Sequence, residues 1–271
     1  MSEGGSALYL YCFAPFVEYA QCSVPGVDGR PSASLCVCAQ IGAILCEVEL
    51  AEFCGEAAEA RLQDLAWLGP QVCRHEAVIE EAMRWAPVLP ARFGTLFTSH
   101  QSLQHFAALH REVIEDFFSR LGDCQEWAVK GMLDRPGAME KFAGSEQSAA
   151  GEAPPVTSPG ARYFQEKRLK AQLERDFRIR LREFCQRAAA MLGAKASGFK
   201  ERKVVDSATD GSDAELVLNW AFLLSPAALD AFRSLVDQLN QVEAYPGLTL
   251  TLTGPWPPYS FTPELSGDEG S

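Results

Sequence analysis

One histidine in this sequence has a neighbour that would suit catalysis or metal binding. His75 is followed by Glu76, and the spacing of the surrounding apolar residues predicts a helix. A zinc site of the H-E-x-x-H type needs a second histidine four positions after the first, so that both rings lie on one helix face. Position 79 is Ile79, so this motif is incomplete. An enzyme that combines His75 with a carboxylate or thiol from elsewhere in the chain stays open as an alternative.

The other potential metal ligands lack a suitable spacing. Cys36 and Cys38 would point to the same face of a strand, yet no further Cys or His pair has the spacing of a closed zinc site. His100, His105 and His110 belong to one predicted helix, where they do not form the adjacent-turn pair that a metal requires. We therefore expect no metal site, and we interpret the two cysteines as small buried apolar residues.

Motifs of the common enzyme classes are missing from the sequence. It contains no G-x-S-x-G, no G-x-x-x-x-G-K and no G-x-G-x-x-G. Activated serines, phosphate loops and dinucleotide sites normally need these scaffolds. We expect a protein that binds other proteins and has neither catalytic residues nor a cofactor.

A long basic element is part of an otherwise acidic chain. The net charge is −12, but residues 162–203 contain 13 Lys and Arg against 5 acids, which is +8 and leaves −20 elsewhere. A basic run of this kind can contact phosphates, so nucleic-acid binding is a further alternative. Its apolar stripe is wide and its arginine face shows no interleaved aromatic residues, so we favour a solvated face and expect no nucleic acid.

The composition is that of a folded, non-secreted protein. Hydrophobic residues make up 47% of the chain and aromatic residues 10%, enough for a sizeable core. The nine cysteines are odd in number, and Met1 to Gly5 form no basic leader, so we expect free thiols in a reducing cytosol. No apolar run approaches the roughly 20 residues of a membrane span. We expect a cytoplasmic protein that does not enter a membrane.

The predicted first domain, residues 1–122, mixes strands and helices. Apolar and aromatic runs predict strands at 8–13, 35–40, 44–50 and 88–97. Helical spacing predicts two segments over 56–84 that meet at Gly69-Pro70, and a helix from a Thr98 or Ser99 cap to Gly122. This β-β-β-α-β-α order leaves the topology open.

The predicted second domain, residues 123–271, has a more symmetric order. Its elements are a strand at 126–133, a long basic helix at 162–192, a hairpin of 199–205 and 216–224 around Asp210-Gly211, a helix at 226–239 and a strand at 248–253. This β-α-β-β-α-β order is the ferredoxin-like split unit. Residues 134–160 are rich in Gly, Pro, Ser and Ala, and we interpret them as a flexible insertion.

Two segments carry unusual side chains for their predicted elements. In Pro87–Phe97, with the sequence PVLPARFGTLF, Arg92 lies on the strand face opposite Phe93, next to a glycine that allows close approach. Gly254–Phe261, with the sequence GPWPPYSF, presents three aromatic residues on a backbone stiffened by proline. These aromatics must cover either their own domain or a partner. The candidate partner-binding residues are therefore Arg92, Phe93, Trp256, Tyr259 and Phe261.

These segments resemble the two strongest signatures of the GvpF/GvpL family of gas vesicle proteins. The resemblance continues through the aromatic strand at 8–13, Leu65–Leu68, His75–Val78, Glu126–Lys130 and the basic helix, and so covers nearly the whole chain. Gly131-Met132 departs from the family pattern, which usually has an apolar-aromatic pair there, and the cysteine content is unusually high.

The resemblance implies a function as well as a fold. It implies a two-domain α+β protein whose second domain is a modified ferredoxin fold. It also implies a minor accessory component in the assembly of gas vesicles, the gas-filled protein shells used for buoyancy. The implied partners are the small hydrophobic shell protein GvpA and other accessory proteins, and the implied location is the cytoplasm, in association with gas vesicles.

Overall fold

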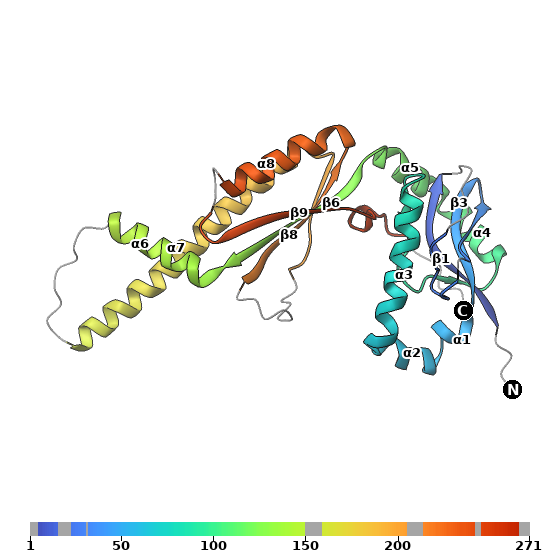
Figure 1. Ribbon diagram of the computed structural model, residues 1–271, viewed down its shortest axis with the longest axis horizontal. Helices are drawn as coiled ribbons and strands as arrows, with labels where there is room; N and C mark the ends of the chain where they lie inside the picture. The colour runs from blue at the N-terminus through green and yellow to red at the C-terminus, as the bar shows by residue number, and fades with distance from the viewer. Residues whose placement is uncertain are drawn as a thin grey trace. The chain divides into compact units, whose positions relative to one another are not determined.

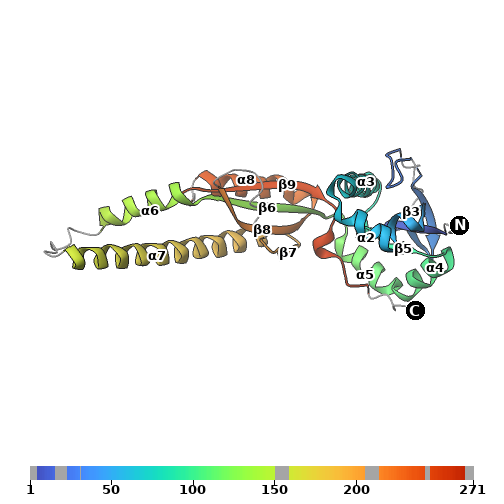
Figure 2. The ribbon, with the colours of Figure 1, turned by 90° about the horizontal axis from the view of Figure 1, so that it is seen from below.

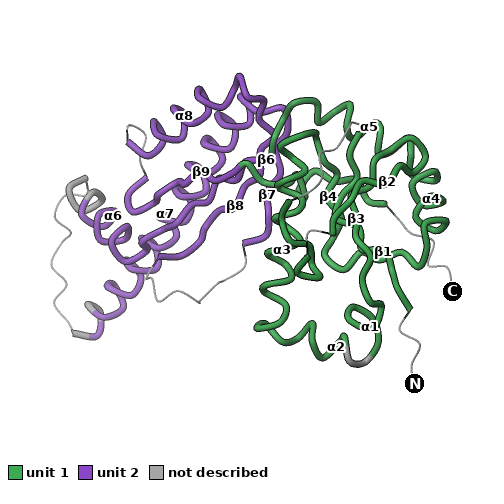
Figure 3. Tube along the Cα trace, turned by 45° about the vertical axis from the view of Figure 1, so that its right-hand side comes forward, with its two compact units in different colours: residues 1–125, 255–271 green, residues 126–254 purple. Residues whose placement is uncertain are grey.

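The computed structural model describes residues 5–15, 23–30, 32–149, 159–204, 214–241 and 245–265. The chain separates into two compact units (Figure 3): unit 1 holds residues 1–125 and 255–271, and unit 2 holds residues 126–254. The division after Gln125 lies close to the predicted boundary at residue 122. The last segment differs, because residues 255–271 belong to unit 1, where Tyr259 packs against the hydrophobic core.

Unit 1 is built on one sheet with the strand order β2-β3-β1-β4, and β5 also pairs with β1. Its strands are β1 (Ser6–Pro15), β2 (Ser34–Cys38), β3 (Ile41–Glu49), β4 (Leu89–Pro90) and β5 (Leu96–Phe97). Its helices are α1 (Leu50–Phe53), α2 (Glu56–Gln63), α3 (Leu65–Met83), α4 (His100–Leu109) and α5 (Arg111–Leu121). The 3-10 turn η2 (Tyr259–Phe261) completes the unit.

The central strand β1 is covered on both faces. Its residues from Ala7 to Ala14 are all buried, which explains why this run is apolar without alternation. Tyr9 belongs to the core cluster that includes Val78 of α3, whereas Phe13 stacks on Phe106 of α4 with ring centroids 6.3 Å apart. Figure 2 shows α3 on one side of these strands and α4 and α5 on the other.

The helix boundaries in unit 1 differ from those predicted. The break falls at Asp64, whose side chain accepts a hydrogen bond from the Ala66 amide at 2.9 Å and so caps α3. Pro70 lies inside α3, and the predicted junction at Gly69-Pro70 was wrong. Ser99 caps α4 as predicted, in a reciprocal capping box with Ser102.

Unit 2 has the strand order β7-β8-β6-β9, which is that of a ferredoxin-like sheet. Its elements, shown in Figure 1, are β6 (Gln125–Asp134), α6 (Arg135–Ala149), α7 (Pro159–Gly193), β7 (Gly198–Glu201), β8 (Ala214–Leu224), the 3-10 turn η1 (Pro226–Ala228), α8 (Leu229–Gln241) and β9 (Leu248–Trp256). Without α6, the order is the predicted β-α-β-β-α-β. The predicted turn at Asp210-Gly211 lies outside the described residues.

One face of this sheet packs against α7 and α8. Alternate residues of β9, Leu248 and Leu250, join Phe184 of α7 and Phe232 of α8 in the core, while Thr249 is exposed. The same alternation in β6 places Val129 and Leu133 in the core. Gly131 is the position where the sequence departs from the family pattern. The space that its side chain would occupy is taken by Leu218 of β8, which a Cβ at position 131 would overlap. The departure is therefore accommodated by local packing.

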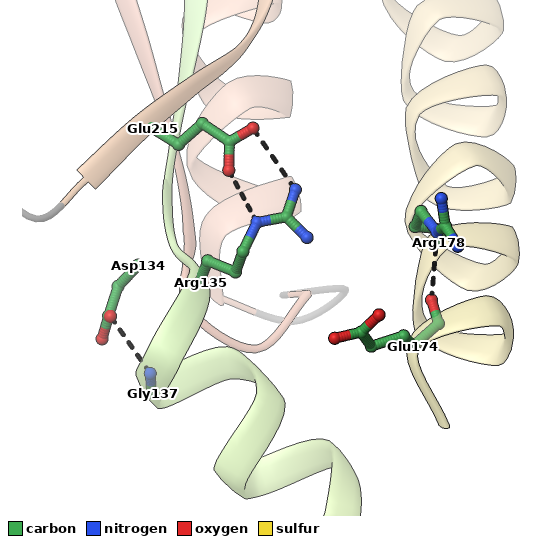
Figure 4. Close-up of polar contacts among 6 residues, drawn as sticks. All are labelled: Asp134, Arg135, Gly137, Glu174, Arg178 and Glu215. Atoms are coloured by element: carbon green, nitrogen blue, oxygen red, sulfur yellow. Dashed lines mark hydrogen bonds and ion pairs between the residues drawn. The ribbon is translucent and has the colours of Figure 1, made fainter. Parts of the chain in front are cut away.

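Residues 135–149 form α6, whereas the sequence suggested a flexible insertion over 134–160. Figure 4 shows the start of this helix, where the Gly137 amide donates to Asp134 Oδ1 at 3.1 Å and Arg135 forms a two-pronged ion pair with Glu215 of β8. Further along, Phe142 is buried in the core of unit 2. The cap by Asp134 and the burial of Phe142 thus stabilise a helix in spite of its many small residues. Residues 150–158 of the predicted insertion lie outside the described part of the chain.

Candidate partner-binding site

The Pro87–Phe97 segment forms two short strands joined by a tight turn. Both strands pair antiparallel with β1, and the segment is anchored between them by hydrogen bonds from the Ala91 amide to the Tyr11 carbonyl at 2.9 Å and from the Leu10 amide to the Thr95 carbonyl at 3.0 Å. Gly94 adopts a φ of 83°, a conformation that favours glycine over residues with a side chain. The predicted single strand is therefore interrupted by a turn, and the Arg92 side chain in this turn is exposed.

Beneath this turn lies a set of hydrogen bonds that we call the His75 network: the side chains of Tyr9, His75, Glu76 and Tyr259. The Tyr9 hydroxyl lies 2.9 Å from His75 Nδ1, and the Gly94 amide donates to the same hydroxyl at 3.1 Å. His75 Nε2 lies 3.2 Å from the Ala91 carbonyl oxygen and 3.2 Å from the Tyr259 hydroxyl. The network therefore holds both ends of the turn.

These distances fit one arrangement of protons. Tyr9 accepts from the Gly94 amide, so its own proton is available for His75 Nδ1, and the imidazole proton then sits on Nε2, where it is donated to Ala91. The Tyr259 hydroxyl donates to Glu76 Oε1 at 2.8 Å. Each buried polar group thus has a partner, as burial without large energetic cost requires.

Burial sets the electrostatics of the network. The His75 side chain is fully buried, and desolvation of its charged form lowers its pKa to about 4. Burial likewise raises the pKa of the Glu76 carboxyl, although the Tyr259 hydroxyl opposes this change. Burial also raises the pKa values of Tyr9 and Tyr259. His75 is therefore a neutral hydrogen-bonding residue at physiological pH.

The network brings together the two segments singled out in the sequence. Tyr259 lies 184 positions after His75, yet its hydroxyl reaches the imidazole, and Phe93 packs edge-on against the same ring with centroids 5.7 Å apart. Among the candidate residues, Phe93 and Tyr259 are thus half-buried and attached to the core of unit 1. Sequence reasoning missed Tyr9 and considered Glu76 only as a possible catalytic or metal-binding neighbour of His75. A tyrosine inside a buried apolar strand was a signal, since its hydroxyl needs a partner.

A cavity opens beside the turn. It measures about 430 Å³ and is bounded by the turn, by β1, by α4 and by the segment 262–265. Its lining includes the apolar side chains of Leu10, Phe13 and Phe106 and the charged side chains of Arg92 and Glu264. Within the described ranges no carboxylate lies within ion-pair distance of Arg92. The site can receive an apolar side chain together with an acidic group.

The remaining candidates are closer to the surface. Trp256, at the end of β9, is 42% exposed, and Phe261 is half-buried in η2. The other chemical groups considered from the sequence do not join this site: Cys36 and Cys38 lie on β2 with their sulfurs 3.7 Å apart. In the described ranges, no cluster of three or more His, Cys, Asp or Glu side chains is arranged to hold a metal ion. None of the helices described there is both long and apolar enough to cross a membrane.

Known proteins are similar to this chain in sequence and in fold. The family model described as "Gas vesicle synthesis protein GvpL/GvpF" matches residues 7–263. Gas vesicle protein L of Streptomyces sp. (strain CB03234) is 28% identical over 255 residues, which is 93% of this chain and 91% of the relative. Gas vesicle protein L2 of Halobacterium salinarum is 27% identical over 199 residues, 72% of this chain and 71% of the relative.

Two crystal structures have the same fold. GvpF from Anabaena sp. PCC7120 superposes with a TM-score of 0.69 at 16% identity and covers 96% of this chain and 97% of its own. GvpF from Microcystis aeruginosa superposes with a TM-score of 0.67 at 16% identity and covers 95% of this chain and 99% of its own.

The fold and the site define a protein of two α+β units, the second ferredoxin-like, whose two sequence signatures meet at a buried histidine. The chain belongs to the GvpL/GvpF family of gas vesicle synthesis proteins. Its role is therefore related to gas vesicles.

Proposed function

We propose that this protein is a non-enzymatic assembly factor that binds the shell protein GvpA and other accessory proteins during nucleation or growth of gas vesicles. It acts in the cytoplasm, in association with the vesicles. The observation that carries the proposal is the junction in unit 1, where the His75 network holds the Arg92 turn and the Tyr259 segment beside an apolar cavity.

The chemistry of this junction suits a peptide partner. Arg92 offers a guanidinium that can bind a carboxylate through two hydrogen bonds, and the cavity beside it accepts an apolar side chain. Trp256 and Phe261 provide additional aromatic surface on the neighbouring segment. A hydrophobic shell subunit with an acidic residue near an apolar one matches these requirements.

The state of His75 supports a binding role over an enzymatic one. Both ring nitrogens are engaged by other groups, the ring is buried, and its pKa of about 4 makes it a weak base. A general base needs contact with the substrate and a pKa near the working pH. We therefore assign His75 to the support of the turn.

The proposal is tested by co-purification of tagged variants with the shell protein from cells that express both. We expect Arg92→Ala and Trp256→Ala to reduce recovery of the shell protein at least tenfold, with thermal unfolding close to that of the wild type. Arg30→Ala, which removes another exposed arginine of unit 1, is the matched control. Full recovery with the double variant Arg92→Ala/Trp256→Ala would refute this site.

A further inference from the structure

The first half of α7 is an exposed cationic helix. The whole helix, residues 159–193, holds nine Lys and Arg and four acids, a net +5, and its first half, residues 159–176, holds five and three, a net +2. Every side chain from Tyr163 to Gln172 is exposed. Figure 1 shows these first turns of α7 extending past the sheet of unit 2, next to α6.

Aromatic residues lie among these cations. Tyr163 is 61% exposed and Phe164 is 72% exposed, and their rings meet edge to face with centroids 5.7 Å apart. At about 100° per residue, Tyr163 lies on the same side of the helix as Lys167 and Lys170, and Phe164 lies on the adjacent side with Arg168. We call these five residues the basic-aromatic face. The sequence interpretation, which found no aromatic residues on the cationic side of this helix, was wrong here.

A solvated charged surface does not account for this face. Lysine and arginine are stable in water, but two adjacent exposed aromatic rings leave a large apolar area that a partner can cover. An acidic partner that also offers apolar side chains would engage both the cations and the rings. An anionic surface without apolar side chains would use only half of the features present.

One exposed stretch of the chain itself combines acidic and apolar residues. Residues 47–64 contain six acids and one arginine, a net −5, opposite in sign and equal in size to the charge of α7. They run from the end of β3 through α1 and α2 of unit 1. Leu62 is 39% exposed, and Leu65, directly after this stretch, is 81% exposed. We call Glu49, Glu59, Leu62 and Leu65 the acidic-leucine surface.

We propose that the basic-aromatic face of one copy docks onto the acidic-leucine surface of a second copy. The cations face the carboxylates of the second copy, and the tyrosine and phenylalanine rings cover its leucines. Because the two surfaces are different, the contact is heterologous and leaves one of each surface free at the ends of a pair. Copies can therefore add in a row. This self-association does not depend on the proposed contact with the shell protein.

Sedimentation velocity on the purified full chain measures the association directly. We expect the sedimentation coefficient to rise with protein concentration at about 0.05 M salt and to lose this dependence at about 0.5 M salt, since ions screen exposed charge pairs. Arg168→Glu/Lys170→Glu should abolish association, as should Glu49→Lys/Glu59→Lys. Tyr163→Ser/Phe164→Ser should weaken it at least tenfold at unchanged charge.

Mixing the two charge-reversed proteins is the decisive measurement. Each should be monomeric alone, but the intact acidic-leucine surface of one should bind the intact basic-aromatic face of the other and restore larger species. Misfolded variants would not recover on mixing. Lys195→Glu/Lys203→Glu, which changes the net charge equally at exposed positions outside the face, is the control and should associate like the wild type.

Several results would overturn the proposal. A wild-type protein that stays monomeric at every concentration and low salt contradicts it, as does a mixture of the two charge-reversed proteins that stays monomeric. Cosedimentation with phosphatidylglycerol vesicles or binding to duplex DNA, if lost in Arg168→Glu/Lys170→Glu while the wild type remains monomeric, would assign the face to a lipid or nucleic-acid partner instead.

Discussion

At the scale of single residues, His75 organises unit 1 through its hydrogen bonds. It joins β1, the Arg92 turn and the final aromatic segment through four groups: the Tyr9 hydroxyl, the Ala91 carbonyl, the Tyr259 hydroxyl and, through Tyr259, the Glu76 carboxylate. A neutral imidazole suits this position because one nitrogen accepts while the other donates. Protonation would turn the accepting nitrogen into a second donor facing Tyr9.

The first prediction concerns pH. The folded-state pKa of His75, about 4, lies below its ordinary value of 6.5, so between these values the unfolded chain binds more protons. The stability that His75 contributes is therefore lost as the pH falls through this window, by about 3 kcal/mol in total. Urea unfolding at several pH values should show this loss in the wild type, and His75→Gln should remove it.

The contribution of Glu76 to the pH dependence of stability must be separated from that of His75. Its raised pKa makes the folded protein bind protons more readily than the unfolded chain, so Glu76 acts in the opposite direction at acidic pH. Subtracting the His75→Gln curve from the wild-type curve isolates the contribution of His75. Parallel pH profiles for both proteins would contradict the assigned role.

A second prediction separates Tyr259 from Trp256. Tyr259→Phe removes a hydroxyl that donates to Glu76, and an unsatisfied half-buried carboxylate should lower the free energy of unfolding by about 1–3 kcal/mol. Trp256→Ala should cost less, because that side chain is 42% exposed. Chemical denaturation of both variants tests this. Equal stability of Tyr259→Phe and the wild type would mean that the hydroxyl has no supporting role.

At the scale of elements, α6 shows how one large side chain can fix a helix of weak sequence character. Its Phe142 ring meets Phe177 of α7 edge to face at 5.6 Å, and the Arg180 guanidinium lies over it at 5.1 Å. The rest of α6 contributes little apolar area, although Ala138 is also buried. Its docking on α7 therefore depends on Phe142.

The third prediction follows from this packing. Phe142→Ala should reduce the free energy of unfolding by about 3 kcal/mol, through the lost transfer energy and the cavity that remains. It should also speed amide hydrogen exchange in α6 more than in β6. Lys141→Ala, an exposed neighbour on the same helix, is the control and should change neither quantity. Unchanged exchange in α6 would mean that other contacts hold the helix.

At the scale of the whole molecule, the chain enters unit 2 after Gln125 and returns to unit 1 after Gly254. Unit 1 is therefore made of two pieces of sequence, and its second piece carries Tyr259. Unit 2 is an insertion in unit 1, and its ends meet in neighbouring strands, because β6 and β9 are adjacent in the sheet.

The fourth prediction uses this arrangement. Truncation after Gly254 should lower the thermal stability of unit 1, because it removes Tyr259 from the His75 network and uncovers the core beside it. A peptide of residues 255–265, added in excess, should restore part of the loss in proportion to the logarithm of its concentration. Truncation after Leu265, which keeps every described residue, is the control. An unaffected melting temperature after the first truncation would contradict the two-piece unit.

The sequence by itself determined the elements whose patterns are local. The alternating leucines and threonines of β9, the Ser99 cap and the apolar stripe of α7 each satisfy rules that act within one helix or strand. The β-α-β-β-α-β order then limited unit 2 to a ferredoxin-like sheet, because few connections of such elements are physically possible.

Only the tertiary structure decided which distant residues meet. No local pattern places Tyr259 on His75, assigns the last residues to unit 1, or shows that Phe142 secures α6. Each depends on burial, which is a property of the packed molecule: a polar group or an aromatic ring takes its partner from whatever segment the fold brings beside it. The hydrogen bonds of His75 are long-range for this reason, whereas the sequence showed His75 and Glu76 only as an incomplete motif that left an enzyme open as an alternative.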